Sequence, residues 1–240
     1  ADTGNNRIQV FERNGTFRRT WGTLGTADGQ MSSPSGVAVG ADGRVYVTDS
    51  VNARIQVFSA TGGFLEKWGS RGGNADQFEL PWGIAVDSSN YVYVVDTNKQ
   101  HVKKLNPTNR ALFTKWGWTG QDPDVSRYSN PRGISLVGGT SLIVADTGNN
   151  RIERCSLTGS AVTGSVVEST GVSPPSALRG RFDNPWGATM AADGSWVVAD
   201  TGNDRIQHRD TLGVWQTPWA TPSADVGLLA LPEAIAADPD

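Results

Sequence analysis

The sequence predicts an all-β fold assembled from repeated sheets, and three observations lead to this prediction. One phrase of eleven residues recurs five times at intervals of roughly fifty residues. Glycine and proline are frequent, with 29 Gly and 12 Pro among 240 residues, as in turn-rich chains. Short apolar runs with the alternation of strands lie between the turns, and none has helical periodicity. Repetition of this kind indicates one structural unit used several times.

The repeated phrase reads Ala-Asp-Thr-Gly-Asn-Asn-Arg-Ile-Gln-Val-Phe in its first copy. Its leading aspartates are separated by 47, 47, 50 and 54 residues. A second phrase, Pro-x-Gly followed by an apolar run, precedes each later copy, and the distance from its Pro to the next Asp is always 15. Such constant spacing marks the boundaries of a unit. The prolines are Pro34, Pro81, Pro131 and Pro185, and Pro232 opens a degenerate fifth copy.

The sequence of each repeat predicts four short strands. In the second repeat they cover 36–39, 45–47, 55–58 and 64–68. Asp42-Gly43 predicts the first tight turn, because Gly supplies the positive φ that such turns need. Four-stranded sheets repeated at this period stack radially as the blades of a β-propeller. We therefore expect one domain over 1–240, with a partial blade at 1–33, full repeats at 34–80, 81–130, 131–184 and 185–231, and a first strand of the closing or next blade at 232–240.

Two longer motifs identify the type of repeat. Gly-x-x-Gly-x-x-x-x-Gln/Arg-Phe-x-x-Pro-x-Gly-Ile-Ala-Val-Asp is clearest over 69–87, and Val-Tyr-Val-x-Asp-Thr-x-Asn-x-Arg-Ile over 45–55 and partly over 143–152. In these motifs the chain resembles the NHL repeat family over nearly its whole length. The resemblance implies four-stranded propeller blades. It leaves function open, because that family includes protein-binding and RNA-binding modules, extracellular sensor domains and a few lyases.

The number of blades stays open between a five-bladed ring and a fragment of a six-bladed ring. The chain begins at the end of a second strand and finishes in a first strand, so about one strand is missing from a shared blade. We favour a processed or partial chain. If the 240 residues were the whole protein, we would expect a neighbouring molecule to supply the strand, which gives head-to-tail self-association and an oligomer.

The most repeated polar motif, Asp-x-x-Asn-x-Arg, predicts a structural staple within each blade. A carboxylate at a strand end can accept backbone N–H bonds across a turn, and Arg is a bidentate donor to carboxylates. The third copy departs from the pattern because His101 stands where the other copies have Arg. The members of this structural motif are Asp2, Arg7, Asp49, Arg54, Asp96, Asp146, Arg151, Asp200 and Arg205.

Aromatic residues give the strongest indication of a binding surface. Trp21, Trp68 and Trp116 recur at the end of the fourth strand and predict packing between blades. The residue between Pro and Gly of the Pro-x-Gly phrase, here called the x position, varies widely instead. Packing alone does not fix such a position, so we expect its side chains to bind a protein or glycan at one mouth of the propeller. The candidate ligand-binding residues are Ser35, Trp82, Arg132, Trp186 and Glu233.

Catalytic residues are not evident, which favours a non-catalytic interaction or scaffold module. His101 and His208 are the only histidines, Cys155 is the only cysteine, and neither a calcium-loop spacing nor a nucleophile elbow occurs. We therefore predict no catalytic residue, no metal and no cofactor. The alternative is a metal-dependent lyase or lactonase-type propeller enzyme, in which His101 and loop carboxylates would hold the metal.

Charge and hydropathy restrict the partners. The net charge of −3 disfavours nucleic acid, because phosphate binding needs a surplus of Lys and Arg. No apolar run approaches the length of a membrane span, so no membrane insertion is expected. Asn14-Gly15-Thr16 is a glycosylation-type sequence in an expected turn and is consistent with an extracellular or periplasmic location, as part of a larger extracellular protein or assembly.

Overall fold

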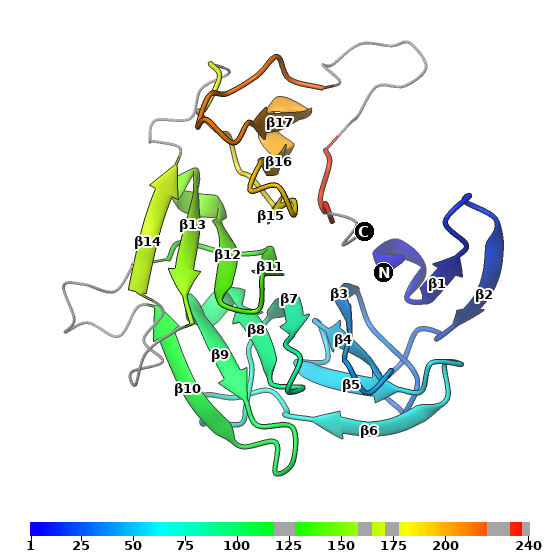
Figure 1. The fold of residues 1–240 in the computed structure, drawn as a ribbon. Coiled ribbons are helices and arrows are strands. Elements are labelled where there is room, and N and C mark those ends of the chain that lie inside the picture. Colours follow the sequence, from blue (N-terminus) through cyan, green and yellow to red (C-terminus); the bar gives the residue numbers. More distant parts are fainter. Residues whose placement is uncertain (118–127, 158–164, 171–177, 220–230, 237–240) are drawn as a thin grey trace. The chain divides into compact units, whose positions relative to one another are not determined.

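The computed structural model describes residues 1–117, 128–157, 178–219 and 231–236, and the backbone of 165–170. The chain divides into two compact units, residues 1–115 and 116–240. The described part consists of antiparallel sheets joined by turns, and its helices are three-residue 3-10 turns (Figure 1). The prediction of an all-β chain is therefore confirmed.

The first unit contains a two-stranded sheet, β1-β2, and two four-stranded sheets with the orders β3-β4-β5-β6 and β7-β8-β9-β10. The strands expected in the second repeat are found with boundaries that differ by at most two residues. The strands are β1 (Ile8–Phe11), β2 (Phe17–Trp21), β3 (Pro34–Val39), β4 (Val45–Asp49), β5 (Arg54–Phe58), β6 (Phe64–Trp68), β7 (Pro81–Val86), β8 (Val92–Asp96), β9 (His101–Leu105) and β10 (Leu112–Gly117).

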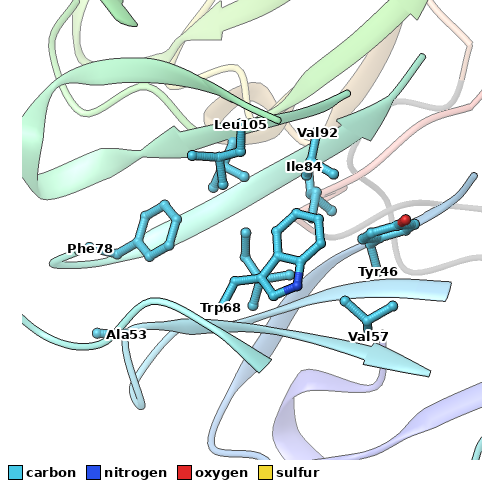
Figure 2. Packing of buried hydrophobic residues seen from close by; sticks show 10 residues of the cluster. Tyr46, Ala53, Val57, Trp68, Phe78, Ile84, Val92 and Leu105 are labelled. Atoms are coloured by element: carbon cyan, nitrogen blue, oxygen red, sulfur yellow. The ribbon is translucent and has the colours of Figure 1, made fainter. Parts of the chain in front are cut away.

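A shared apolar core joins the second and third repeats. Trp68 at the end of β6 is only 3% exposed and packs with Tyr46 of β4, at a ring separation of 5.6 Å. Phe78, in the segment that leads into the third repeat, and Ile84 of the third repeat belong to the same cluster (Figure 2). Large aromatic side chains bury much apolar area, so this cluster stabilises the contact between the two sheets. The expected packing role of Trp68 is confirmed.

The second unit contains a four-stranded sheet, β11-β12-β13-β14, and a three-stranded sheet, β15-β16-β17. Phe182 and Trp215 pack edge to face at 5.4 Å in its core, with Ile143 and Val198 in the same cluster. The strands are β11 (Ile134–Val137), β12 (Ser141–Asp146), β13 (Arg151–Ser156), β14 (Ser165–Thr170), β15 (Gly187–Met190), β16 (Trp196–Asp200) and β17 (Arg205–Arg209).

The last repeats differ from the ideal pattern in two places. Where a fourth strand is expected beside β17, Trp215 and Trp219 form isolated bridges to Arg209 and Ile206. Residues 232–236, expected within a first strand, have no strand assignment. This segment contacts the preceding repeat, where the Thr201 hydroxyl donates to the Pro232 carbonyl at 2.6 Å. Residues 237–240 lie outside the described part, and the repeat boundaries stay a prediction.

A 3-10 turn follows the aspartate in four copies of the repeated phrase, and a residue with left-handed backbone geometry follows that turn. These residues allow the chain to reverse direction before the next strand. In the second copy the same place is a plain turn, and Ala53 adopts φ of 55°. The turns are η1 (Thr3–Asn5), η2 (Thr97–Lys99), η3 (Thr147–Asn149) and η4 (Thr201–Asn203).

Candidate functional site

After the x positions Ser35 and Arg132, the next Gly lies against the backbone of the following repeat. A Cβ placed on Gly36 would lie 2.5 Å from the carbonyl oxygen of Trp82, and one on Gly133 would lie 2.3 Å from that of Trp186. Real Cβ atoms do not approach so closely, so the Gly of Pro-x-Gly is needed for backbone contact with the next repeat. Within each unit, this contact brings consecutive x positions near each other.

In the first unit, Ser35 and Trp82 occupy the x positions. The Ser35 hydroxyl bonds the Trp82 carbonyl at 3.2 Å and also contacts the Ser50 hydroxyl. Thr48 donates a second hydrogen bond to the Trp82 carbonyl at 2.5 Å. These bonds hold the backbone of Trp82, whose side chain is half-buried at the start of β7. The hydroxyl of Ser35 thus positions its neighbour's main chain.

In the second unit, Arg132 and Trp186 form a stacked pair. The guanidinium carbon of Arg132 lies 3.9 Å from the centroid of the Trp186 ring, and both side chains are partly exposed. Burial lowers the pKa of Arg132, while the charge of Glu233 acts in the opposite direction. Glu233 itself is exposed. The arrangement combines a flat apolar surface with a positive charge and a nearby carboxylate.

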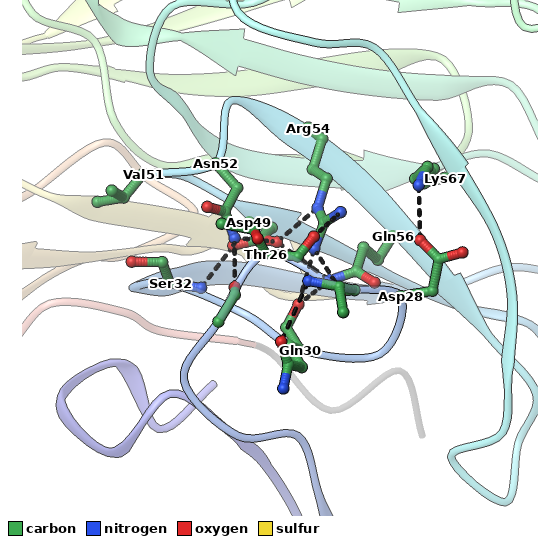
Figure 3. Close-up of polar contacts among 12 residues, drawn as sticks. Thr26, Asp28, Gln30, Ser32, Asp49, Val51, Asn52, Arg54, Gln56 and Lys67 are labelled. Atoms are coloured by element: carbon green, nitrogen blue, oxygen red, sulfur yellow. Dashed lines mark hydrogen bonds and ion pairs between the residues drawn. The ribbon is translucent and has the colours of Figure 1, made fainter.

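The Asp-x-x-Asn-x-Arg loop forms a dense hydrogen-bond network around its aspartate. Asp49 is fully buried and accepts bonds from Arg54 Nε at 2.8 Å and from Asn52 Nδ2 at 2.9 Å (Figure 3). Gln56 Nε2, at 3.0 Å, and the backbone N–H of Ser32, at 2.7 Å, complete its partners. A buried carboxylate needs such partners, and they fix the loop against β5 and the chain that enters β3.

The same pairing of Asp with Arg recurs in three further copies. Arg7, Arg151 and Arg205 each place Nε 2.7 Å from the aspartate five residues earlier. Burial raises the pKa of Asp146, although hydrogen bonds from Ser129 and Asn149 oppose this shift. These contacts connect strand ends within one repeat, which is the geometry expected of a structural staple. The pairs are Asp2 with Arg7, Asp146 with Arg151, and Asp200 with Arg205.

The third copy has a different set of partners. Asp96 accepts backbone N–H bonds from Leu80 at 2.9 Å and from Glu79 at 3.2 Å. His101 is 7% exposed, and its Nε2 atom has no hydrogen-bond partner among the described residues. Burial and the charge of Lys103 lower the pKa of His101 to about 3, so the imidazole is neutral at ordinary pH. Burial also raises the pKa of Asp96.

In the copies at Asp2, Asp49, Asp146 and Asp200, the hydroxyl group next to the aspartate donates to the carbonyl of the Pro before the following x position. Thr3 donates to the carbonyl of Pro34 at 2.8 Å, and Ser50 donates to that of Pro81 at 2.5 Å. Thr147 donates in the same way to Pro185 at 2.8 Å. The sequence interpretation missed this link. Its signal is visible in retrospect, because Ser or Thr follows the Asp in every copy.

Metal-binding groups are dispersed in the described residues, where no three His, Cys, Asp or Glu side chains gather as a metal site would require. His208 stacks on Trp219 at a ring separation of 5.0 Å. Cys155 is buried beside the Tyr128 hydroxyl, and burial raises the pKa of its thiol to about 12, which keeps it protonated. None of the helices in the described ranges is long and apolar enough to cross a membrane.

Comparison with known proteins supports a propeller fold. Residues 31–58 and 78–105 match the NHL repeat. None of the curated protein sequences matches this chain. A catalytically inactive virginiamycin B lyase from Staphylococcus aureus with quinupristin is similar with a TM-score of 0.65 and 16% identity, over 98% of this chain and 68% of that chain.

Two further solved structures are similar over nearly the whole chain. A streptogramin B lyase has a TM-score of 0.66 and 19% identity, over 99% of this chain and 68% of its own. A protein of unknown function from Bacteroides caccae has a TM-score of 0.65 and 12% identity, over 96% and 79%. At such identities the likeness concerns the fold alone. The predicted fold, a β-propeller of NHL-type blades, is confirmed.

Proposed function

Since this chain belongs to the NHL repeat family, we propose that it is a non-catalytic interaction module that binds a protein or glycan through its x positions. The observation that carries the proposal is the stack of Arg132 on Trp186. Both side chains stand on a backbone that the neighbouring Pro and Gly residues hold in place, and both remain partly exposed. Arg and Trp are the residue types most enriched where binding energy concentrates.

The test begins with a peptide library and a glycan array screened with the intact chain. The affinity for the selected ligand is then measured for Trp186→Ala, Arg132→Ala and Trp82→Ala. If these residues are central to binding, each substitution should cost about 2 kcal/mol or more of binding free energy. Such a loss weakens the affinity roughly 30-fold. Leu212→Ala is the matched control, since Leu212 is an apolar side chain in a turn with 87% exposure. Unchanged affinity in all three folded variants would contradict the proposal.

A second candidate function is a metal-dependent lyase, favoured by the fold likeness to the two lyases. On this reading the chain would cleave a substrate with the help of a metal held by loop side chains, with His101 the first residue to examine. Mass spectrometry of quinupristin incubated with the protein, together with elemental analysis, tests it. Cleavage that stops on chelation would establish the lyase function and displace the binding-module proposal. Intact quinupristin together with a metal-free folded protein would contradict the lyase function.

Head-to-tail self-association and an extracellular or periplasmic location complete the proposal. Phe11 and Phe17, an edge-to-face pair on β1-β2, are each 53% exposed, whereas Phe58 at the place of Phe11 in the second repeat is 1% exposed. Sedimentation equilibrium of the wild type against Phe11→Ser tests association, which the variant should weaken.

Asn14 is exposed in the turn between β1 and β2, as a glycosylated residue must be. Secretion assays test the location, and a purely intracellular chain would refute it.

A further inference from the structure

The third repeat holds the ammonium group of Lys104 among three aromatic rings. Lys104 Nζ lies 4.2 Å from the ring centroid of Tyr91 and 5.2 Å from those of Tyr93 and Phe113. The rings come from β8, the turn before it, and β10, while Lys104 lies on β9 between them. A cation within about 6 Å of a ring face is attracted by the ring's quadrupole. Three rings around one ammonium group form an aromatic cage.

Contacts among the cage residues hold the rings in place. Tyr91 and Phe113 pack edge to face at 5.3 Å, and Tyr93 donates from its hydroxyl to Asp87 at 3.0 Å. Asp87 also accepts the backbone N–H of Tyr91 at 2.9 Å. The carboxylate therefore holds the Tyr93 ring and the main chain of Tyr91 in place. Burial lowers the pKa of Lys104, and the negative charge of Asp87 opposes this shift. A cation site organised in this way loses little entropy when it is filled.

Comparison with the second repeat shows that a blade of this type folds without an aromatic cage at this place. Tyr46 pairs with Val57 across β4 and β5, in the register in which Tyr93 pairs with Lys104 across β8 and β9. At the places of Tyr91 and Phe113 the second repeat has Arg44 and Leu65, and Arg44 forms an ion pair with the neighbouring Glu66 at 3.1 Å. The blade thus folds with a small apolar residue in place of Lys104. The aromatic set and its lysine are particular to the third repeat in the first unit.

We propose that Tyr91, Tyr93, Phe113 and Asp87 form a binding site for an alkylammonium group, a primary or methylated amine, and that Lys104 is its built-in occupant. Aromatic faces recognise primary and quaternary ammonium groups by the same electrostatic attraction. Phe113 is 52% exposed, so one wall of the cage is open to solvent. An external amine therefore fills the cage when the side chain of Lys104 is absent. This site is independent of the x positions and of the function proposed for them.

Removal of Lys104 followed by chemical rescue tests the proposal. Thermal unfolding of Lys104→Ala is measured with increasing n-butylammonium chloride, and n-butanol serves as the neutral probe of the same chain length. The ammonium probe should raise the unfolding temperature in a saturable way, by about 3–6 °C at tenfold its dissociation constant. Tetramethylammonium should act similarly, and its methyl proton signal should shift upfield in the ring currents. Equal effects of n-butylammonium and n-butanol, or no effect, would overturn the proposal.

Two further variants keep the test decisive. Lys104→Val introduces the residue that the second repeat tolerates at position 57, and it replaces Lys104→Ala if that variant does not fold. Failure of both variants to fold even with n-butylammonium present would also overturn the proposal. Phe113→Ala added to Lys104→Val should abolish the response to the ammonium probe. Val57→Ala in the second repeat is the matched control and should show no ammonium-specific stabilisation, since a response there would mean a general salt effect.

Discussion

The second and third repeats build the same loop around a buried aspartate, yet Asp49 and Asp96 have different partners. Asp49 accepts side-chain bonds from Asn52, Arg54 and Gln56, in its own loop and the next strand, in addition to the backbone N–H of Ser32. Asp96 instead accepts two backbone N–H groups from the chain that enters β7. The comparison teaches that the loop geometry needs a buried acceptor with filled hydrogen-bond capacity, and that the donors can be exchanged.

The cation in this loop also changes between the repeats. The Arg54 guanidinium donates to the carbonyls of Thr26, Ala27 and Gln30, each at 2.9 Å. In the third repeat, Lys103 takes over part of this role. Its Nζ atom donates to the carbonyl of Ala75 at 3.1 Å and to that of Gln77. A buried ammonium replaces the guanidinium, and the shorter imidazole of His101 fills the space at the position of Arg54.

A second substitution compensates for the first across the repeat boundary. Asn6 in the first repeat accepts the backbone N–H of Ser33 at 2.8 Å. Ala53, at the equivalent place in the second repeat, has no side-chain acceptor for the corresponding N–H of Leu80. That N–H donates to Asp96. His101 does not take the place of Arg54 as a donor to the carboxylate among the described contacts, so Asp96 has the capacity to accept this N–H.

The largest expected effect is on the free energy of unfolding when Asp49 is replaced, compared with the replacement of Asp96. Asp49→Ala leaves the Arg54 charge buried without its carboxylate and removes an acceptor from two amide side chains. We expect a loss of about 3–5 kcal/mol of unfolding free energy. Asp96→Ala should cost less, about 1–3 kcal/mol, because it mainly strands backbone N–H groups. Urea denaturation of both variants measures the difference, and equal losses would show that the donors are not what distinguishes the loops.

Acid should affect the third repeat through His101. Its pKa is about 3 in the folded chain and 6.5 in a model peptide, so the unfolded state binds more protons between these values. The contribution of the neutral imidazole to the free energy of unfolding is fully present above pH 6.5. It is lost as the pH falls toward 3, by up to about 1.4 kcal/mol per pH unit. The difference in unfolding free energy between wild type and His101→Gln, followed against pH, reports this group. A difference that does not depend on pH would show that His101 is not the source of the acid sensitivity.

The smallest expected effect concerns Ala53, whose φ of 55° is unfavourable for a residue with a Cβ. Asn is found with the same geometry at Asn6 and Asn150, where its side chain also accepts an N–H from the next repeat. Ala53→Asn should therefore raise the unfolding free energy by about 0.5–1 kcal/mol. Asn150→Ala is the reverse exchange and should lower it. Denaturation midpoints that move in the same direction for both variants would refute this explanation.

The sequence predicted the strands and the turns of the second repeat to within two residues. The signals are local, since alternation of apolar residues marks β4 and β5, and Asp42-Gly43 marks the turn before them. Gly43 indeed adopts φ of 76°. The weakest expectation was the fourth strand beside β17, where Trp215 and Trp219 form bridges instead of a ladder. Fourth strands lie at the sheet edge, where one partner alone defines them.

The candidate site was only partly predictable. The varying residues at the x positions identified Arg132 and Trp186 as candidates, but their stacking became visible only in the structure. Ligand binding by Ser35 stays a prediction, and the structure adds that its hydroxyl contacts Ser50 and the Trp82 carbonyl. A short hydroxyl side chain finds whichever acceptor the neighbouring strands bring within reach, and no local pattern encodes that choice.

By itself, the sequence determined the repeat, its period, and the residues that each copy devotes to turns and to its buried aspartate, because these depend on neighbours within a few positions along the chain. The tertiary structure alone decided which partners those residues meet. Leu80 donates to Asp96, and Lys104 sits among Tyr91, Tyr93 and Phe113, because stacked sheets bring together groups that are distant in sequence. Burial then removes water as an alternative partner and makes each of these pairings matter.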